Sequence, residues 1–244
     1  MDNIQKPSQG AKAYQLPIIV LVTNFSRDAS KPGMLNLEEI DTLFHEMGHA
    51  MHSVLAQTDY QHIAGTRVAM DFVEIPSVLM ESFAKSPNCL SFGRHYKTGK
   101  PVPLDLIAEK RAMQQNGHAH DVNVQIQMAM LDQIYHGEKS GSLDFNPISA
   151  YHELQALTNH NGAASLTTWP GHFTHLVGYG STYYSYLWSR MWADRIYSKL
   201  FDGNSANEWR QGGELIRNEL LKCGGGRDAW IGLEKVGVVK EGEN

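Results

Sequence analysis

The residues best suited to chemistry form one short motif, His-Glu-Met-Gly-His at positions 45 to 49. Positions four apart on a helix lie one turn apart on the same face, so His45 and His49 can bind one metal ion together. A catalytic zinc site has three protein ligands and keeps its fourth position open for water. Glu46 borders the same face and can accept a proton from that water. The motif therefore predicts a zinc-dependent hydrolase.

The third ligand decides which class of zinc enzyme this is. In the metzincin class, a glycine and a third histidine stand three and six residues after the second histidine of the motif. This chain has His52 and Leu55 at those positions. The metzincin class is therefore excluded, and a carboxylate further along the chain becomes the expected third ligand.

The first glutamate after the motif is Glu74, in the run Asp-Phe-Val-Glu-Ile-Pro-Ser. Asp71 is its rival, because a carboxylate oxygen from either residue type is an acceptable zinc ligand. We favour Glu74 because it opens a predicted helix at 76–84, which is a stiffer platform than the glycine-containing connection at 60–72. Glu81 lies seven residues after Glu74 on the same helix face. It either accepts a hydrogen bond from the far nitrogen of a ligand histidine or is a solvated charge, and the sequence leaves both open.

The motif needs a helix, and its surroundings predict one at 37–56. Apolar residues recur at helical spacing, at Leu37, Ile40, Phe44, Met47 and Met51. Asn36 can cap the first turn, where Glu38 and Glu39 suit the helix dipole. Gly48 lies in the middle of this helix, where glycine costs about 1 kcal/mol relative to alanine. We therefore expect another segment to approach the helix closely at Gly48.

A second group of candidate residues lies in the segment 172–186, HFTHLVGYGSTYYSY. Peptide hydrolysis builds negative charge on the carbonyl oxygen, and hydrogen-bond donors placed there lower the barrier. Histidine and tyrosine side chains are suitable donors. Tyr183 and Tyr186 are three residues apart on the next predicted helix and share a face. The alternative is an aromatic-rich core, to which composition alone gives equal or greater weight.

Three stretches together resemble the catalytic region of the thimet oligopeptidase family of zinc metallopeptidases: LFHEMGHAMHS, GTRVAMDFVEIPSVLMESFA and FTHLVGYGSTYYSYLWSRMWADRIY. The resemblance runs from about Leu16 to the glycine triplet 224–226. It implies one zinc ion per chain, with Glu46 as the catalytic base and the ligands His45, His49 and Glu74. It also implies that substrate is bound by His175, Tyr179, Tyr183 and Tyr186.

The resemblance further implies a mainly α fold. It would be a helical zincin-type catalytic domain with a minor β element, forming half of a two-lobed channel peptidase. We take residues 1–244 as one zinc peptidase catalytic region. Members of the family are far longer and have a large helical region before the zinc helix, whereas 44 residues precede His45 here. We expect this N-terminal region, or a partner, to complete the channel.

The function implied by the resemblance is that of a zinc-dependent endopeptidase or oligopeptidase acting on peptides or precursor proteins. Within the family, the sequence most resembles the mitochondrial processing members. This implies removal of N-terminal octapeptides from imported precursors in the mitochondrial matrix. No transit peptide is visible in residues 1–14, so the cytoplasm is the expectation if the resemblance to those members fails. The alternative function is a non-catalytic, truncated fragment that retains the zinc-binding fold.

Composition narrows the class of protein further. The chain has 244 residues, is 42% hydrophobic and carries a net charge of −5. Without a cluster of lysine and arginine, it is not expected to bind nucleic acid or an anionic membrane. The longest apolar run, 16–22, is too short to span a bilayer and predicts a buried strand. Cys89 and Cys223 fit a reducing compartment, and we expect them to be buried rather than paired.

Periodicity and turn residues predict the remaining elements. Polar or glycine-containing loops are expected at 24–36, 137–147 and 159–170. A glycine, Gly117, is expected to separate two helices. The full set of helices predicted after the zinc helix is 76–84, 89–96, 104–115, 119–136, 148–157, 182–201 and 207–222.

Overall fold

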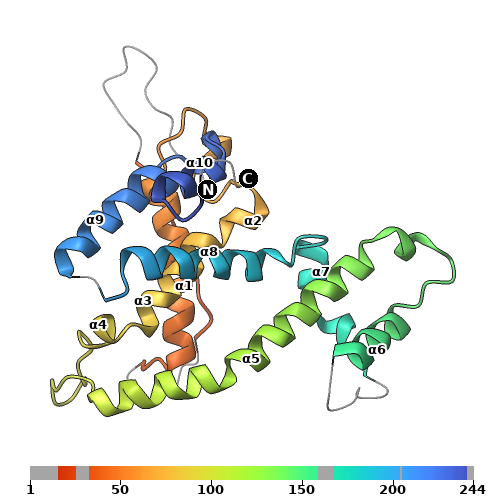
Figure 1. Cartoon of the computed structure of the whole chain (residues 1–244), viewed down its shortest axis with the longest axis horizontal. Helices are drawn as coiled ribbons and strands as arrows, with labels where there is room; N and C mark the ends of the chain where they lie inside the picture. Colours follow the sequence, from red (N-terminus) through yellow and green to blue (C-terminus); the bar gives the residue numbers. More distant parts are fainter. Residues whose placement is uncertain (1–15, 26–32, 159–166, 204, 241–244) are drawn as a thin grey trace. The chain divides into compact units, whose positions relative to one another are not determined.

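The computed structural model describes residues 16–25, 33–158, 167–203 and 205–240 (Figure 1). Its helices are α1 (Leu37–Leu55), α2 (Met70–Val73), α3 (Ile75–Lys85), α4 (Pro87–Leu90), α5 (Leu104–Tyr135), α6 (Pro147–Thr158), α7 (His175–Gly178), α8 (Ser185–Leu200), α9 (Ala206–Ile216) and α10 (Ala229–Val236). Short 3-10 turns lie at Gln61–Ile63, Glu138–Gly141, Trp169–His172 and Gly224–Gly226, and a π turn at Arg217–Leu221 extends α9. Within the described ranges, the β structure is one isolated bridge between Arg94 and Pro101. The predicted mainly α class is confirmed.

The chain divides into two compact units. Unit 1 comprises Met1–Ile107 and Ser189–Asn244, and unit 2 comprises Ala108–Trp188. The boundaries fall inside the long helices α5 and α8. The zinc motif therefore belongs to unit 1, and the histidine- and tyrosine-rich segment belongs to unit 2.

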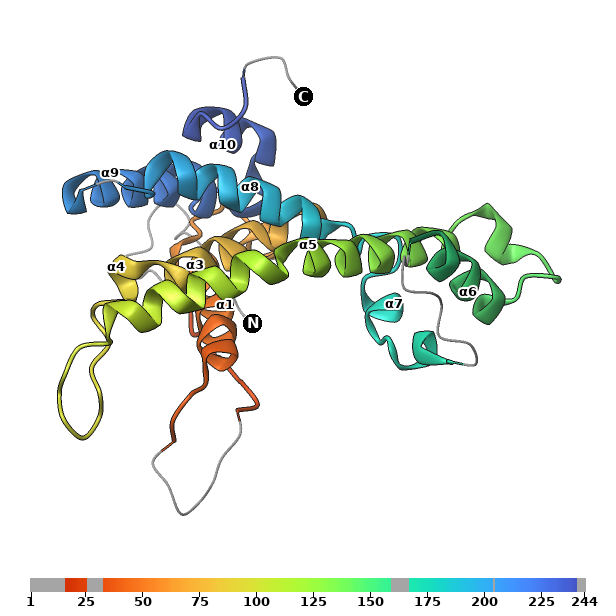
Figure 2. The same ribbon diagram turned by 60° about the horizontal axis from the view of Figure 1, so that its bottom comes forward.

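Unit 1 is built around the pair of helices α1 and α3, which pack across one another in both ribbon views (Figures 1 and 2). Aromatic rings surround Phe83 on α3, and its ring centroid lies 5.3 Å from that of Tyr197, 4.7 Å from Phe201 and 5.5 Å from Trp209. Such edge-on ring contacts add to the stabilisation that burial alone provides. The buried apolar side chains of this core include Ile75, Leu79, Trp192, Ile196, Ile216, Leu220, Leu233 and Val236.

The start of α1 is fixed by its own sequence. The Asn36 side chain accepts a hydrogen bond from the Glu39 backbone N–H at 2.8 Å, and the Glu39 carboxylate accepts one from the Asn36 N–H at 2.9 Å. This reciprocal capping box satisfies two backbone donors that would otherwise lack partners at the helix start. The predicted cap is therefore present, and it sets where the zinc motif falls along α1.

Gly48 is the point at which α1 and α3 touch. A Cβ atom added at Gly48 would lie 2.4 Å from the Cα of Ser77 and 2.6 Å from the carbonyl oxygen of Pro76. Both are backbone atoms of α3, so they cannot move aside as a flexible side chain would. The close approach predicted at this glycine is confirmed, and it brings the motif's helix against the helix that follows Glu74.

Gly48→Ala is therefore expected to destabilise the fold, even though alanine favours a helix. Overpacking a tight contact typically costs about 1–3 kcal/mol, and here the clash is with backbone. Chemical denaturation of the variant measures the loss. Gly213→Ala on α9 is the matched control, because a Cβ there meets nothing within 4 Å. The stability of Gly213→Ala should rise slightly. An equal loss of stability in both variants would contradict the explanation by close contact.

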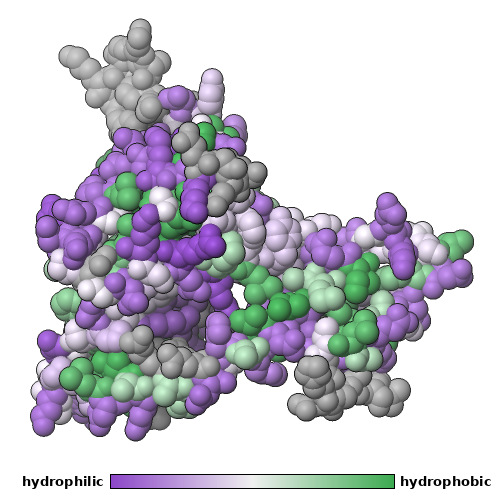
Figure 3. Space-filling model, viewed as in Figure 1, coloured by the Kyte–Doolittle hydropathy of each residue, from purple (hydrophilic) through white to green (hydrophobic). Residues whose placement is uncertain are grey.

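Unit 2 contains α6, α7 and most of α5. The side chains of Leu131 and Leu154 are buried, at 1% and 2% exposure. Residues of α5 and α6 together line a cavity of about 700 Å³, to which the segment between the two helices also contributes. Figure 3 shows hydrophobic side chains on the surface over α6 and the adjoining part of α5. Leu157 on α6 is 80% exposed.

The predicted buried strand at 16–22 is wrong. These residues form no strand, and Leu16, Ile18, Val20 and Val22 are all at least 68% exposed. A strand needs a neighbouring backbone to complete its hydrogen bonds. In the described part of the chain, no other strand pairs with this segment. Its alternate apolar side chains therefore remain exposed.

Helix boundaries account for the other corrections. The chain continues through Gly117 as the single helix α5, because one glycine costs less than ending a helix and nucleating another. The helix predicted at 89–96 ends at Leu90 and gives way to a turn whose tip is Gly99, with a φ of +65°. The short helices α2, α7 and α10 were not predicted, and α2 lies largely in the connection expected at 60–72. The predicted loops at 24–36 and 159–170 lie partly outside the described residues.

Two further expectations concern the environment of the protein. Cys89 and Cys223 are both unpaired and half-buried. No helix in the described ranges combines the length and the apolar character needed to cross a membrane.

Candidate metal centre

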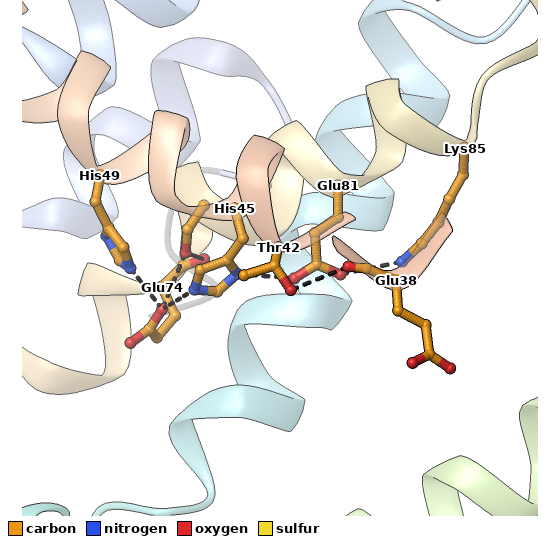
Figure 4. A network of polar contacts seen from close by, with 8 residues as sticks. Glu38, Thr42, His45, His49, Glu74, Glu81 and Lys85 are labelled. Atoms are coloured by element: carbon orange, nitrogen blue, oxygen red, sulfur yellow. Dashed lines mark hydrogen bonds and ion pairs between the residues drawn. The ribbon is translucent and has the colours of Figure 1, made fainter. Parts of the chain in front are cut away.

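Three side chains from two helices converge on one point (Figure 4). His45 and His49 project from the same face of α1, and Glu74 stands at the N-cap position directly before α3. One oxygen of Glu74, Oε2, lies 3.3 Å from Nε2 of His45 and 3.1 Å from Nε2 of His49. The Glu74 side chain is only 4% exposed. The crossing of α1 and α3 at Gly48 therefore brings the motif and the downstream glutamate together.

The spacing of these atoms fits a zinc ion. Zinc bonds of about 2.0–2.2 Å in a tetrahedral arrangement place neighbouring ligand atoms about 3.4 Å apart. The histidine nitrogens stand at nearly this distance from Glu74, and the three ligand atoms all lie within 4.8 Å of one another. Two imidazole nitrogens and one carboxylate oxygen form the donor set of an open catalytic site. Among the described residues, this is the group able to hold a metal, and Asp71 on α2 is not part of it.

A second layer of contacts holds two of these ligands in place. Nδ1 of His45 is 2.8 Å from Oε1 of Glu81, and the other oxygen of Glu81 accepts a hydrogen bond from Lys85 at 3.0 Å. The Ser77 hydroxyl donates to Oε2 of Glu74 at 2.9 Å. Glu81 is thus a partner of His45 and not merely a solvated charge. Its bond to Nδ1 turns Nε2, the other ring nitrogen, toward Glu74.

The electrostatics of the centre favour a positive charge between the two carboxylates. Burial would lower the pKa of His45, but the hydrogen bonds that its ring donates to Glu74 and Glu81 outweigh this effect and raise that pKa to about 9. Burial alone would raise the pKa of the Glu74 carboxyl. The hydrogen bonds that this carboxylate accepts from His45 and His49 instead hold its pKa far below the usual range. Glu74 therefore stays ionised. The positive charge that these carboxylates stabilise is the charge that a divalent cation would supply.

Glu81→Gln is expected to weaken metal binding without abolishing it. An outer partner of a ligand histidine typically contributes about 10–100-fold in metal affinity. Competition with a chromophoric chelator measures the change. Glu38→Gln removes the same charge from an exposed position on α1 and should leave the affinity unchanged. Equal affinities in the Glu81 variant and the parent chain would show that the contact with His45 is incidental.

Glu46 follows His45 directly on α1 and is half-buried. His52 lies one turn beyond His49 and is completely buried, and burial lowers its pKa to about 4. A neutral, enclosed imidazole is a packing residue of this helix. The position of Glu46 beside the ligands is what the predicted role of proton acceptor requires.

The four residues expected to bind substrate form one aromatic cluster, which lies entirely in unit 2. The His175 ring centroid lies 5.6 Å from that of Tyr179, 5.6 Å from Tyr183 and 6.0 Å from Tyr186. Tyr179 and Tyr183 lie 5.4 and 5.1 Å from Tyr186. The structure therefore brings together all four residues, and their roles remain predictions.

The members of the aromatic cluster differ in exposure. Tyr183 is 6% exposed, and its hydroxyl donates a hydrogen bond to Oε1 of Gln125 at 3.2 Å. His175 is exposed, while Tyr179 and Tyr186 are half-buried. Sequence reasoning missed Gln125, because it is 58 residues away from Tyr183 along the chain.

Comparison with known proteins agrees with this site. The model of peptidase family M3 matches residues 1–243. The mitochondrial intermediate peptidase of Sclerotinia sclerotiorum is 46% identical over 238 residues, which cover 93% of this chain and 30% of that protein. That of Coccidioides immitis is 44% identical over 230 residues, covering 90% of this chain and 29% of the relative. The chain thus spans less than a third of the length of these curated relatives, and it belongs to peptidase family M3.

Proposed function

We propose that this chain carries the catalytic centre of a zinc-dependent peptidase. The observation that supports this most strongly is the convergence of His45, His49 and Glu74, with ligand atoms spaced as zinc requires. When bound there, zinc would polarise the scissile carbonyl and make a water molecule more acidic. The zincs of hydrolytic enzymes keep an open position for that water, and a set of three protein ligands leaves one.

The residues around the proposed zinc site have separate roles in the reaction. Glu46 accepts the proton of the attacking water and delivers it to the leaving amine, as a general base and then a general acid. Glu81 fixes the orientation of the His45 ring through Nδ1, and Ser77 fixes the Glu74 carboxylate. Because these partners are set before substrate arrives, the centre does not need to reorganise during the reaction.

The aromatic cluster has the second role in this proposal. His175, Tyr179, Tyr183 and Tyr186 bind the peptide, and their polar groups donate hydrogen bonds to the oxygen that becomes negative in the tetrahedral intermediate. Tyr183 and Tyr186 are proposed as the main donors, and the Tyr183 hydroxyl also contacts Gln125.

The relatives suggest the substrate and the compartment. Because they are named mitochondrial intermediate peptidases, we propose that the substrates are precursor proteins imported into the mitochondrial matrix. The product would be an N-terminal octapeptide. The part of the relatives that this chain does not span, or a partner that replaces it, is proposed to complete the substrate channel.

A quenched fluorescent peptide tests the proposal. The zinc-loaded chain should cleave it, a chelator should abolish cleavage, and added zinc should restore it. The same assay on the chain fused behind the preceding region of the Sclerotinia sclerotiorum relative tests whether that region is needed. Cleavage that survives the chelator would contradict a metallopeptidase. Zinc-loaded protein without turnover in both forms would favour the non-catalytic alternative.

A further inference from the structure

The turn that carries the aromatic cluster is held by one buried carboxylate. Asp132, near the end of α5, is completely buried. Its Oδ1 accepts a hydrogen bond from the backbone N–H of Ser181 at 3.0 Å, and its Oδ2 accepts one from the N–H of Tyr183 at 3.0 Å. The two oxygens of one side chain thus each bind a backbone donor of a turn about 50 residues away, and all of these atoms belong to unit 2.

Neighbouring residues of α5 support the same turn. The His136 ring lies with Nδ1 2.8 Å from Oδ1 of Asp132. Its other side lies against Gly180, where an added Cβ would meet Nε2 of His136 at 2.8 Å. Gln133 donates from Nε2 to the carbonyl oxygen of Ser181 at 2.9 Å. The end of α5 therefore contacts the turn at Gly180, Ser181 and Tyr183.

The turn has a conformation that needs such support. Ser181 has a φ of +63° and is the one non-glycine residue with positive φ in the described ranges. A non-glycine residue in this region is strained, and it persists where the surroundings over-determine it. A buried carboxylate is likewise costly unless its oxygens are bonded. The two unfavourable features offset each other, because the carboxylate binds the N–H groups that this turn presents.

The position of the turn determines the position of the cluster. Tyr183 receives one of the two bonds from Asp132 at its backbone, and its ring lies 5.1 Å from that of Tyr186 and 5.6 Å from that of His175. Helix α8 begins two residues later, at Ser185, and carries Tyr186 in its first turn. Moving the Tyr183 backbone would therefore shift the rings that the proposed function assigns to substrate.

We propose that Asp132 is a positioning residue for peptide hydrolysis: it fixes the Ser181–Tyr183 backbone and so presents Tyr183, Tyr186 and His175 as one preorganised group. The inference rests on the function proposed above for the aromatic cluster. Asp132 acts on the reaction only through that group and does not itself contact substrate. Its loss should affect turnover more than it affects zinc binding or folding.

Asp132→Asn is the principal test, because the amide keeps the shape but turns an NH₂ group toward one of the two backbone donors. Hydrogen exchange of residues 180–186, zinc content, kcat and KM are measured on the zinc-loaded chain. We expect the protection of the Ser181 and Tyr183 amides to fall at least tenfold. We expect kcat to fall about 10–100-fold, as small misplacements of catalytic groups do, with zinc content unchanged.

Leu154→Ala is the matched control, because it removes a buried side chain on α6 that is outside the aromatic cluster. Compared at equal loss of thermal stability, it should keep both kcat and the protection of the two amides. Gly180→Ala is the second test variant. Its methyl group would press on the His136 ring, so it should reproduce the effects of Asp132→Asn with the carboxylate intact.

Several outcomes would overturn the inference. One is parental amide protection in Asp132→Asn, and another is parental kcat despite lost protection. Equal losses of kcat in Asp132→Asn and Leu154→Ala would show that the Asp132 carboxylate contributes only to the stability of the fold and does not position the aromatic cluster. Failure of the proposed function looks different. In that case the parent chain cleaves no peptide or Tyr186→Phe keeps its kcat, while the exchange data still report whether Asp132 holds the turn.

Discussion

Glu46→Gln should retain zinc and lose nearly all peptidase activity, with kcat falling about 10²–10⁴-fold. Glutamine has the same shape as glutamate, so α1 and the neighbouring ligands His45 and His49 should keep their positions. The amide oxygen, however, cannot take up the proton that the attacking water must release. Zinc content and peptide cleavage, measured on the same preparation, separate these two effects.

The control for this experiment is Glu38→Gln, an exposed position about two turns earlier on α1 with no proposed role. It should bind zinc and cleave peptide as the parent chain does. Near-normal turnover in the Glu46 variant would show that another group accepts the proton. Loss of zinc would show instead that Glu46 supports the metal centre.

Tyr186→Phe should lower kcat with little change in KM. A donor aimed at the developing oxyanion acts in the transition state and only weakly on bound substrate. Losing one such donor typically costs roughly 3–4 kcal/mol, or about 10²–10³-fold in kcat. Tyr183→Phe should also reduce kcat but by a smaller factor, because that hydroxyl is buried and donates to Gln125.

Tyr184→Phe is the matched control for the tyrosine variants. Tyr184 is their neighbour in sequence, is 39% exposed and is not a member of the aromatic cluster. It should turn over at the parental rate. Unchanged kcat in both test variants would mean that the aromatic cluster is a packing core, which is the alternative raised by the sequence.

The metal centre could be predicted because most of its information is local. The spacing of His45 and His49 places them on one helix face whatever the rest of the fold does. Gly48 indicated a close crossing, and the crossing helix proved to be the one that begins directly after Glu74. The contact between His45 and Glu81 followed only from that crossing, so the sequence left the role of Glu81 open.

Features that depend on distant partners were not predictable in the same way. Asp132 reads as an ordinary acidic residue within a helix, and its partners Ser181 and Tyr183 lie 49 and 51 residues away. The strand predicted at 16–22 was wrong because the local pattern is not sufficient for a strand. Among the described residues, no neighbouring strand pairs with this segment.

Helix α10 has boundary residues that are visible in the sequence. Asp228 caps its start by accepting a hydrogen bond from the N–H of Trp230 at 3.0 Å. Gly237 ends it in the left-handed conformation, with a φ of +78°. An Asp before and a glycine after a short apolar segment are ordinary helix boundaries, and the eight residues between them were too few to show a clear period.

The most direct test of the central claim is the zinc content of three proteins purified in parallel: the chain itself, Glu74→Gln and Asp71→Asn. The structure places Glu74 in the group of potential ligands and leaves Asp71 outside it. We therefore predict about one zinc per molecule in the parent chain and in Asp71→Asn, and a large loss in Glu74→Gln. Zinc lost only from the Asp71 variant, or absent from the parent chain after reconstitution, would contradict the assignment of His45, His49 and Glu74 as the metal centre.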